Sequence, residues 1–220
     1  NEGKFFNNVP DDLQQNLAGI DDLGGPKYFN HYAWGWTHAG NTPFRRWKRE
    51  TYRGGTADPF LVCWPKGIKA KGEIRHQYCH AIDMAPPVLD ALGIEPPTHI
   101  RGVTQAPIEG LSLKTSFDDA KAPAKHITQY FEMLGHRSLY HDGWRAVCPW
   151  PGTSFTESGR AFGDPIDYDM LTDLDAHHWE LYNLNADFAE TNNLADKERD
   201  RLIAMIGMWY VEAGKYNVLP

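Results

Sequence analysis

The sequence predicts a mixed α/β fold, in which the end of a larger sheet is followed by a small antiparallel sheet packed by a C-terminal helix. A continuous apolar run at residues 60–64 precedes a helical pattern over residues 78–92, which together make one strand–helix unit of an α/β sheet. Further along, β-type runs flank the pair Asp142-Gly143, which is a strong hairpin signal. An amphipathic pattern over residues 197–213 then predicts the closing helix.

The first part of the chain is expected to contain little regular structure before its strand. Residues 11–17 begin with acidic residues and carry apolar residues four apart, which predicts a short helix, and the breakers at residues 24–26 end it. Residues 33–56 are aromatic and basic without periodicity, which is typical of a loop with a function. The run at residues 60–64, closed by Pro65, is expected to be a strand buried on both faces.

The helix after this strand carries its own start and stop signals. Pro86 and Pro87 predict a kink or a late start, because proline lacks the amide hydrogen that a helix interior needs. Gly93 is expected to end the helix. Residues 95–126 are rich in proline, glycine and short polar runs, so loops are expected there, with one short helix near residues 112–117.

The second part is expected to form the small sheet and its covering helix. A polar insertion is expected at residues 149–176, and strands are predicted at residues 127–133, 137–140, 144–148 and 179–184. The core is expected to contain Trp144, Trp179, Leu202, Ile203, Met205, Ile206 and Trp209. The change of pattern divides the chain into two predicted domains, residues 1–125 and residues 126–220.

Composition and charge exclude some classes of function. The 220 residues are 41% hydrophobic and 23% charged, as in an ordinary soluble protein, and the net charge of −7 argues against a nucleic-acid partner. No apolar run reaches the roughly 18 residues of a membrane span. The three cysteines are too few for a disulfide framework and are expected to be reduced and mostly buried. The compartment stays open between cytoplasm and periplasm.

Four stretches resemble one protein family and occur in that family's order. Residues 41–56 resemble the sulfatase loop that ends in an x-E/R-G-G turn, and residues 72–86 resemble the D-hydrophobic-x-P-T-hydrophobic-L helix. Residues 140–147 are similar to the R-x-G-x-W-K hairpin, and residues 181–195 to the closing segment L-Y-D-L-x-x-D-P-x-E-x-x-N-L-A. Together these stretches resemble the C-terminal portion of a type I sulfatase, of the arylsulfatase family in the alkaline phosphatase superfamily.

This resemblance implies an alkaline-phosphatase-like main sheet and the hydrolysis of a small-molecule sulfate monoester. In the family, formylglycine made from the Cys or Ser of a C/S-x-P/A-x-R motif is the nucleophile, and a calcium ion is held by two N-terminal Asp residues and a D-N-G motif. This sequence contains neither motif: Cys63 comes nearest and lacks the Arg. We therefore expect a fragment that by itself holds no calcium ion and contains no formylglycine residue. Such a fragment is expected to be inactive without a missing N-terminal half.

Lys48 is the candidate catalytic residue. The resemblance places it where sulfatases bind a sulfate oxygen, and a fixed ammonium group stabilises the negative charge on a transferring sulfuryl group. From spacing alone, a solvated lysine in a basic run is the favoured interpretation of Lys48.

Four further residues are candidates for substrate binding: His38, Asn41, Thr42 and Arg45. Polar and aromatic groups around His38 are suited to the pocket for the alcohol part of the ester, unless they only pack this loop. Arg45 would attract an anionic substrate, unless it pairs with an acidic neighbour such as Glu50 or Asp58.

The remaining histidines point less strongly to a site. His76 and His80 have zinc-ligand spacing, but no further ligand is placed to help. His177 and His178 are interpreted as surface residues. The hairpin residue His136, or Arg137 beside it, is a candidate for approaching the substrate pocket in a complete sulfatase.

Two alternatives to a sulfatase fragment stay open. The chain is also consistent with a non-catalytic binding or structural module derived from a sulfatase, or with part of a phosphonate or phosphate ester hydrolase of the same superfamily. In each case, the apolar faces left by the missing half are expected to be covered by that half or by self-association.

Overall fold

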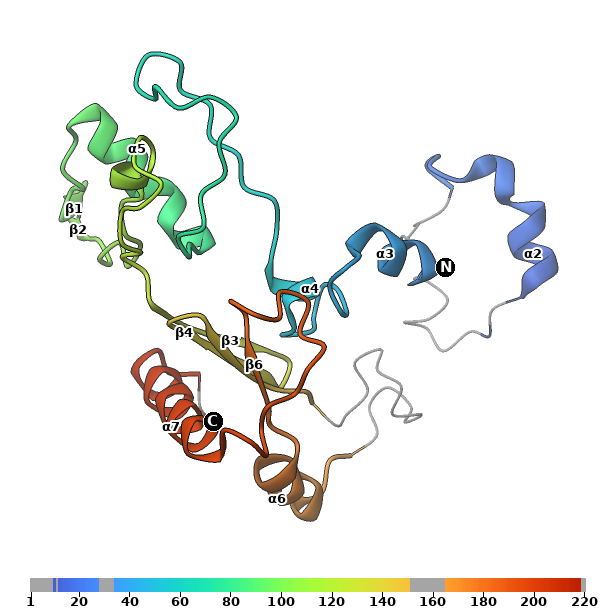
Figure 1. Ribbon diagram of the computed structural model, residues 1–220. Coiled ribbons are helices and arrows are strands. Elements are labelled where there is room, and N and C mark those ends of the chain that lie inside the picture. The colour runs from blue at the N-terminus through green and yellow to red at the C-terminus, as the bar shows by residue number, and fades with distance from the viewer. Residues whose placement is uncertain (1–9, 11, 28–33, 151–164, 219–220) are drawn as a thin grey trace.

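The computed structural model describes residues 10, 12–27, 34–150 and 165–218. Its centre is a four-stranded antiparallel sheet in the order β3-β4-β5-β6 (Figure 1). The strands are β3 Thr128–Met133, β4 His136–His141, β5 Trp144–Cys148 and β6 Glu180–Asn183. Each lies within two residues of its predicted position, so the small antiparallel sheet is confirmed.

The hairpin between β4 and β5 forms at the predicted turn. Asp142 and Gly143 both have positive φ, 44° and 80°, and His141 pairs with Trp144 across the turn. These two positive angles are those of a type I′ turn, whose twist matches that of the strands it joins. The turn therefore sets the register of β4 against β5 from within the local sequence.

The two faces of the sheet bury different kinds of side chain. Leu139, Ala146, Cys148 and Leu181 contribute to an apolar core under the C-terminal helix. Neighbouring residues on the same strands, such as Arg145, Val147 and Tyr182, face the opposite way and contact residues 45–52. Since side chains alternate along a strand, one face packs a helix and the other carries polar contacts to a loop.

Two helices cover the apolar face. In α7 (Arg199–Lys215), Leu202, Met205 and Trp209 are buried, as predicted. Ile203 is 56% exposed, so its predicted burial is wrong. It follows Leu202 directly, and one step along a helix turns a side chain about 100° away from the buried stripe.

The second helix lies inside the predicted polar insertion. Helix α6 (Tyr168–His177) starts at Asp167, whose side chain accepts the amide hydrogen of Met170, and it buries Leu174. It was not predicted, because its sequence is polar apart from a few apolar positions. Residues 151–164 of the insertion lie outside the described part of the chain.

Several predicted elements of the first half are present. Helix α2 (Leu13–Ala18) is capped by Asp12, and α5 (Ala85–Leu92) starts late, with prolines in its first turn. Gly93 ends α5 in the left-handed conformation, with φ of 65°. The 3₁₀ turns η1 (Ile20–Asp22), η2 (Ala81–Met84) and η3 (Lys114–Ser116) complete these elements, and η3 is the predicted short helix.

Two stretches that were predicted to be loops contain regular structure. Helices α3 (Trp34–Asn41) and α4 (Arg53–Thr56) lie within residues 33–56, which were predicted as a loop without regular structure. Strands β1 (His99–Ile100) and β2 (Val103–Thr104) form a small second sheet where loops were expected. Figure 1 shows α4 and α7 on opposite sides of the central sheet.

The predicted strand at residues 60–64 does not form. These residues are not part of either sheet, and Leu61 is 86% exposed. A strand needs a hydrogen-bonded neighbour, and in the described part of the chain no strand pairs with this segment. Cys63 is therefore exposed, contrary to the expectation of burial, while Cys148 is buried, and the described cysteines are free thiols.

No helix in the described ranges is both long and apolar enough to cross a membrane.

Candidate functional site

The site is built around the loop of residues 45–54, which carries Lys48. The amide of Gly54 donates to the carbonyl oxygen of Arg45 at 3.1 Å, which closes the loop at its base. Within it, the amide of Glu50 donates to the carbonyl oxygen of Trp47 at 3.0 Å, forming a tight turn around Lys48. Lys48 is exposed, whereas Glu50, Thr51 and Tyr52 are buried.

The paired glycines at the base of the loop are needed for close backbone approach. A Cβ atom added to Gly54 would lie 2.1 Å from the carbonyl oxygen of Arg45. One added to Gly55 would lie 1.9 Å from that of Glu50. Any other residue at either position would collide with the backbone of the loop, which explains the Gly-Gly pair of the motif in physical terms.

Asn41 ties the loop from outside. Its amide nitrogen donates to the carbonyl oxygens of Arg46 at 2.6 Å and Gly54 at 2.8 Å. Both hydrogens of the side-chain amide are therefore used within the protein. A direct contact of Asn41 with substrate stays a prediction; the contacts present hold the backbone of the Lys48 loop.

The backbone on both sides of Lys48 is in a sparsely populated conformation. Arg46 and Arg49 have φ of 63° and 86°, in the left-handed region that residues with a Cβ seldom occupy. Such conformations persist only where surrounding contacts hold them. The turn that presents Lys48 is therefore set by its anchors rather than by local preference.

Glu190 anchors both ends of this loop. Its Oε2 accepts the amide hydrogen of Arg53 at 2.8 Å, and its backbone carbonyl oxygen accepts from Nη1 of Arg45 at 3.1 Å. Its Oε1 lies 3.2 Å from Nε of Arg145, and both side chains are almost completely buried. Burial raises the pKa of the Glu190 carboxyl, while the charge of Arg145 opposes this rise.

Arg145 supplies a third point of attachment. Its Nη2 donates to the carbonyl oxygen of Thr51, inside the loop, and to Oγ of Ser138 at 3.0 Å. Its guanidinium carbon lies 4.9 Å from the ring centroid of Phe131, so the cation is also stacked on an aromatic face.

Arg45 and Tyr52 form a second cluster with β6. Arg45 donates to the hydroxyl of Tyr182 at 2.8 Å, and the hydroxyl of Tyr52 donates to Glu180 at 2.9 Å. Nη1 of Arg45 also lies 3.7 Å from Glu180. The acidic partner of Arg45 is therefore Glu180 rather than the expected Glu50 or Asp58, and its role in substrate binding stays a prediction.

The other two predicted substrate residues lie at the end of α3. The ring of His38, which is exposed, contacts the edge of Trp47 with centroids 6.4 Å apart. The hydroxyl of Thr42 donates to the carbonyl oxygen of His38 at 3.1 Å. The structure thus brings His38, Asn41, Thr42 and Arg45 into one region beside the Lys48 loop, and their contact with substrate remains untested.

Glu50 and His136 meet beneath the loop. Oε2 of Glu50 lies 3.4 Å from Nδ1 of His136, which accepts the amide hydrogen of Trp150 at 3.0 Å. Burial raises the pKa of Glu50 to about 7 and lowers that of His136 to about 4. Between those values both groups are uncharged, so this contact is not an ion pair there.

The remaining candidate residues have structural partners. Arg137 binds Asp175 and the hydroxyl of Tyr210, on the α6 and α7 side of the sheet. His177 and His178 are exposed, as predicted, and both contact Asp173 at 2.8 Å. Within the described ranges, His, Cys, Asp and Glu form no group of three or more suited to a metal ion, so His76 and His80 gain no further ligand.

Asp83, which belongs to the motif of residues 72–86, has a structural role. Its Oδ2 accepts from the amide of His80 and contacts Nδ1 of His126, each at 2.8 Å. Its Oδ1 accepts from the amide of Leu111 at 2.8 Å. Completely buried, this carboxylate joins three segments far from the Lys48 loop in sequence.

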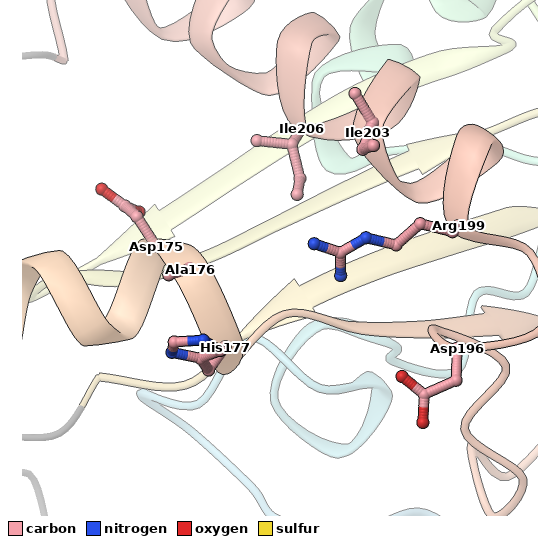
Figure 2. A pocket seen from close by; sticks show the side chains of 7 residues that line it. All are labelled: Asp175, Ala176, His177, Asp196, Arg199, Ile203 and Ile206. Carbon is pink, nitrogen blue, oxygen red and sulfur yellow. The ribbon is translucent and has the colours of Figure 1, made fainter.

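An open cleft of about 500 Å³ lies between the end of α6 and the start of α7 (Figure 2). Its lining mixes the charged residues Asp175, Asp196 and Arg199 with His177, Ile203 and Ile206. None of the predicted substrate residues lines it, and Lys48 does not either.

Sequence reasoning missed Glu190 and Arg145 as site residues. Both stood within recognised motifs, Arg145 in the hairpin and Glu190 in the closing segment, but neither was assigned a role. In the same closing segment, Asp187 accepts from the amides of Thr191 and Asn192, and Asn193 accepts from those of Leu181 and Ala195. The acidic and amide residues of this motif thus build the turn that places Glu190.

Comparison with known proteins relates the chain to one family. Residues 45–141 match the family described as N-sulphoglucosamine sulphohydrolase, C-terminal. The chain is 29% identical over 153 residues to N-acetylglucosamine-6-O-sulfatase of Bacteroides thetaiotaomicron, covering 68% of this chain and 23% of that protein. It is 27% identical to N-sulphoglucosamine sulphohydrolase of Homo sapiens, covering 71% of this chain and 36% of that protein.

A solved structure shares the fold. It was described in connection with the metabolism of multiple glycosaminoglycans by Bacteroides thetaiotaomicron. It aligns with a TM-score of 0.56 at 18% identity, over 79% of this chain and 32% of that one. The chain thus spans about a quarter to a third of the length of these relatives.

Proposed function

We propose that the chain is a C-terminal portion of a sulfatase and that it serves the hydrolysis of a sulfate monoester, because residues 45–141 match a sulfatase family model and the named relatives are sulfatases. The proposed activity is that of the complete protein, and this chain contributes the loop that carries Lys48. The observation that supports the proposal is the position of Lys48: an exposed lysine on a turn that is followed by the buried residues 50–52 and anchored at its base, inside the matched region.

The proposed role of Lys48 is to bind a sulfate oxygen in the transition state. A sulfuryl group in transfer carries negative charge on its oxygens, and a cation fixed in advance stabilises that charge without reorganisation. Arg45 begins the loop, and Asn41, Thr42 and His38 lie beside it. These four residues are proposed to contribute to the substrate pocket, either directly or by holding the loop.

The substrate class is proposed from the named relatives. Two of them carry glucosamine sulfates in their names, so an amino-sugar sulfate is the first substrate to test. Phosphonate or phosphate esters remain the alternative for this superfamily.

The nucleophile and the metal ion are proposed to come from outside this sequence. The described residues contain no cluster of three metal-ligating side chains, and the sequence has neither a C/S-x-P/A-x-R nor a D-N-G motif. The described residues therefore do not fit a calcium site, and the sequence offers no motif from which formylglycine is made. We infer that a preceding portion of the protein supplies both.

That same portion is proposed to cover an apolar surface of the first half, within the predicted domain of residues 1–125. Large apolar side chains are exposed along this stretch, among them Leu61, Ile74, Val88 and Val103. A surface of this kind marks an interface. The missing α/β portion of a sulfatase is the proposed occupant, and self-association is the alternative.

Replacement of Lys48 tests the proposed function. In the full-length protein, Lys48→Met should lower kcat/KM for a sulfate ester by about a hundredfold to a thousandfold, because one fixed donor to the transition state is lost. The measurement is hydrolysis of 4-nitrophenyl sulfate and of glucosamine 6-sulfate, with 4-nitrophenyl phosphate alongside.

Lys197→Met is the matched control, since Lys197 is an exposed lysine of the second half, outside both the loop and the proposed interface. The control should hydrolyse sulfate esters at the wild-type rate. A Lys48→Met rate equal to that of the control would remove Lys48 from the mechanism, and faster cleavage of the phosphate ester would favour the phosphatase alternative.

A further inference from the structure

We propose that Glu190 and Arg145 are positioning residues for Lys48, a role that rests on the proposed function of the Lys48 loop. Neither side chain belongs to the loop, and both are buried in the C-terminal sheet region. Together they contact the loop at Arg45, Thr51 and Arg53, beside the contacts that Arg45 makes with Tyr182 and Thr51 with the carbonyl oxygen of Arg137.

The contacts of Glu190 fall on both sides of Lys48. Its side chain holds the amide of Arg53 after the turn, and its own backbone carbonyl holds the guanidinium of Arg45 before it. One residue thus fixes the separation of the two ends of the loop. Glu190 itself has φ of 58°, a conformation that a residue with a Cβ keeps only under restraint.

Arg145 connects the central sheet to the loop. It lies on β5, pairs with Glu190 at 3.2 Å and donates to the carbonyl oxygen of Thr51. The Glu190–Arg145 pair therefore joins the turn after β6, the strand β5 and the loop in one buried network. Removal of either charge leaves the other buried without its counter-ion.

The strained turn around Lys48 makes this network necessary. Arg46 and Arg49 both have positive φ, and Lys48 lies between them on an exposed tip. If the base is released, these residues can relax to ordinary conformations and Lys48 moves. A displacement of about 1 Å at a reacting group can lower the rate about a hundredfold.

The test compares Glu190→Gln with a matched buried carboxylate in the full-length protein. Asp83→Asn is the control, because Asp83 is equally buried and hydrogen-bonded but contacts His80, Leu111 and His126 instead of the loop. Hydrogen exchange is measured for the amides of residues 45–54 and of α7. We expect exchange in the loop to rise about tenfold in Glu190→Gln alone, as for the loss of one hydrogen bond to a charged group.

Kinetics in two backgrounds separate positioning from general stability. Glu190→Gln should lower kcat by about a hundredfold when Lys48 is present, and hardly at all in the Lys48→Met background, since the group it positions is then gone. Equal losses in both backgrounds, or faster exchange throughout α7 as well as in the loop, would overturn the proposal.

Two provisions keep the test decisive. If Glu190→Gln does not fold, Arg145→Lys replaces it, because it keeps the charge opposite Glu190 and loses the reach to Thr51 and Ser138. If the wild-type protein hydrolyses no sulfate ester, the proposed function fails, while loop exchange still decides positioning: a selective rise supports it and an unchanged loop refutes it.

Discussion

Glu50 is the least ordinary titratable residue near Lys48, because its carboxyl is buried two positions along the same loop. Burial raises its pKa to about 7, and burial together with the charge of Arg46 lowers the pKa of neighbouring His136 to about 4. The folded state therefore keeps a proton on Glu50 that the unfolded chain releases near pH 4.5. Below about pH 7, the protonated carboxyl of Glu50 therefore places no negative charge beneath the loop.

This protonation predicts a pH-dependent gain from Glu50→Gln. A raised carboxyl pKa contributes stability below pH 4.5, and this contribution is lost as the pH rises through about 7. Glutamine resembles the neutral acid. The stability of Glu50→Gln relative to wild type should therefore be greater at pH 8 than at pH 4.5, by up to about 3 kcal/mol. Urea unfolding at the two pH values measures this difference.

The comparison has to be made between variants at each pH. The depressed pKa of His136 contributes stability above pH 6.5 that is lost as the pH falls through about 4, so the two groups oppose each other between these values. Glu95→Gln, at an exposed position, removes the same charge and serves as the control. A pH-independent difference between Glu50→Gln and wild type would show that Glu50 is ionised in the folded protein.

At the scale of elements, the sheet is stabilised from both sides by different means. Helix α7 packs apolar side chains against one face, with Leu202 and Trp209 among the most buried residues described. The other face holds the loop by hydrogen bonds and the Glu190–Arg145 pair. The apolar face should therefore determine how stable the sheet is, and the polar face where the loop lies.

Adjacent residues of α7 test the first of these statements. Leu202→Ala should destabilise the sheet region by about 2–5 kcal/mol, since Leu202 is 1% exposed and its removal leaves a cavity. Ile203→Ala, at a position 56% exposed, should cost less than about 1 kcal/mol. Hydrogen exchange of the β4 and β5 amides in the full-length protein reports both, and equal effects would contradict the assigned face of α7.

The elements that the sequence predicted well are those specified by local chemistry. The Asp142-Gly143 turn, the proline-rich start of α5 and its end at Gly93 depend on backbone preferences of a few residues. The strand at residues 60–64 was wrong, because a strand depends on a partner, and none of the described residues pairs with it. Helix α3 was missed because its Trp, Gly and polar residues carry no apolar period.

The residues of the candidate site also fall into those that local sequence could locate and those that depend on the tertiary fold. Lys48 and the Gly-Gly pair could be located from a motif, since they are close in sequence. Glu190 lies 137 residues beyond Arg53, and Tyr182 lies 137 residues beyond Arg45, so their contacts depend on the tertiary fold and have no local signal. The burial of Glu50 belongs to the same class, because it follows from how the loop rests on the sheet.

At the scale of the whole molecule, the two halves differ in their cores: most buried apolar residues lie in the second half, whereas the first half exposes many of its large apolar side chains. Leu61 is 86% exposed in a segment with the composition of a buried strand. If the proposed preceding portion of the protein covers this segment, a charge there should be tolerated only in the absence of that portion.

An aspartate at Leu61 tests this cover. In the full-length protein, Leu61→Asp should lower the free energy of unfolding by about 3 kcal/mol or more. The substitution would bury a charge in the interface, and it would also remove an apolar contact. Val211→Asp is the control, since Val211 is 68% exposed on α7, away from the proposed interface. Equal tolerance of the two substitutions in thermal or urea unfolding would mean that this surface stays open in the complete protein.

The anchoring of the Lys48 loop by Glu190 also sets an order of events during synthesis on the ribosome. Arg53 emerges 137 residues ahead of the carboxylate that holds its amide. At about 5–20 residues per second, that distance is a delay of roughly seven to thirty seconds. Early in this interval the loop has only its own glycines and Asn41, because Arg145 follows 92 residues after Arg53 and Glu190 comes last. A polypeptide that ends before β6 would lack Glu190, so the codons for residues 180–190 decide whether the Lys48 loop is anchored.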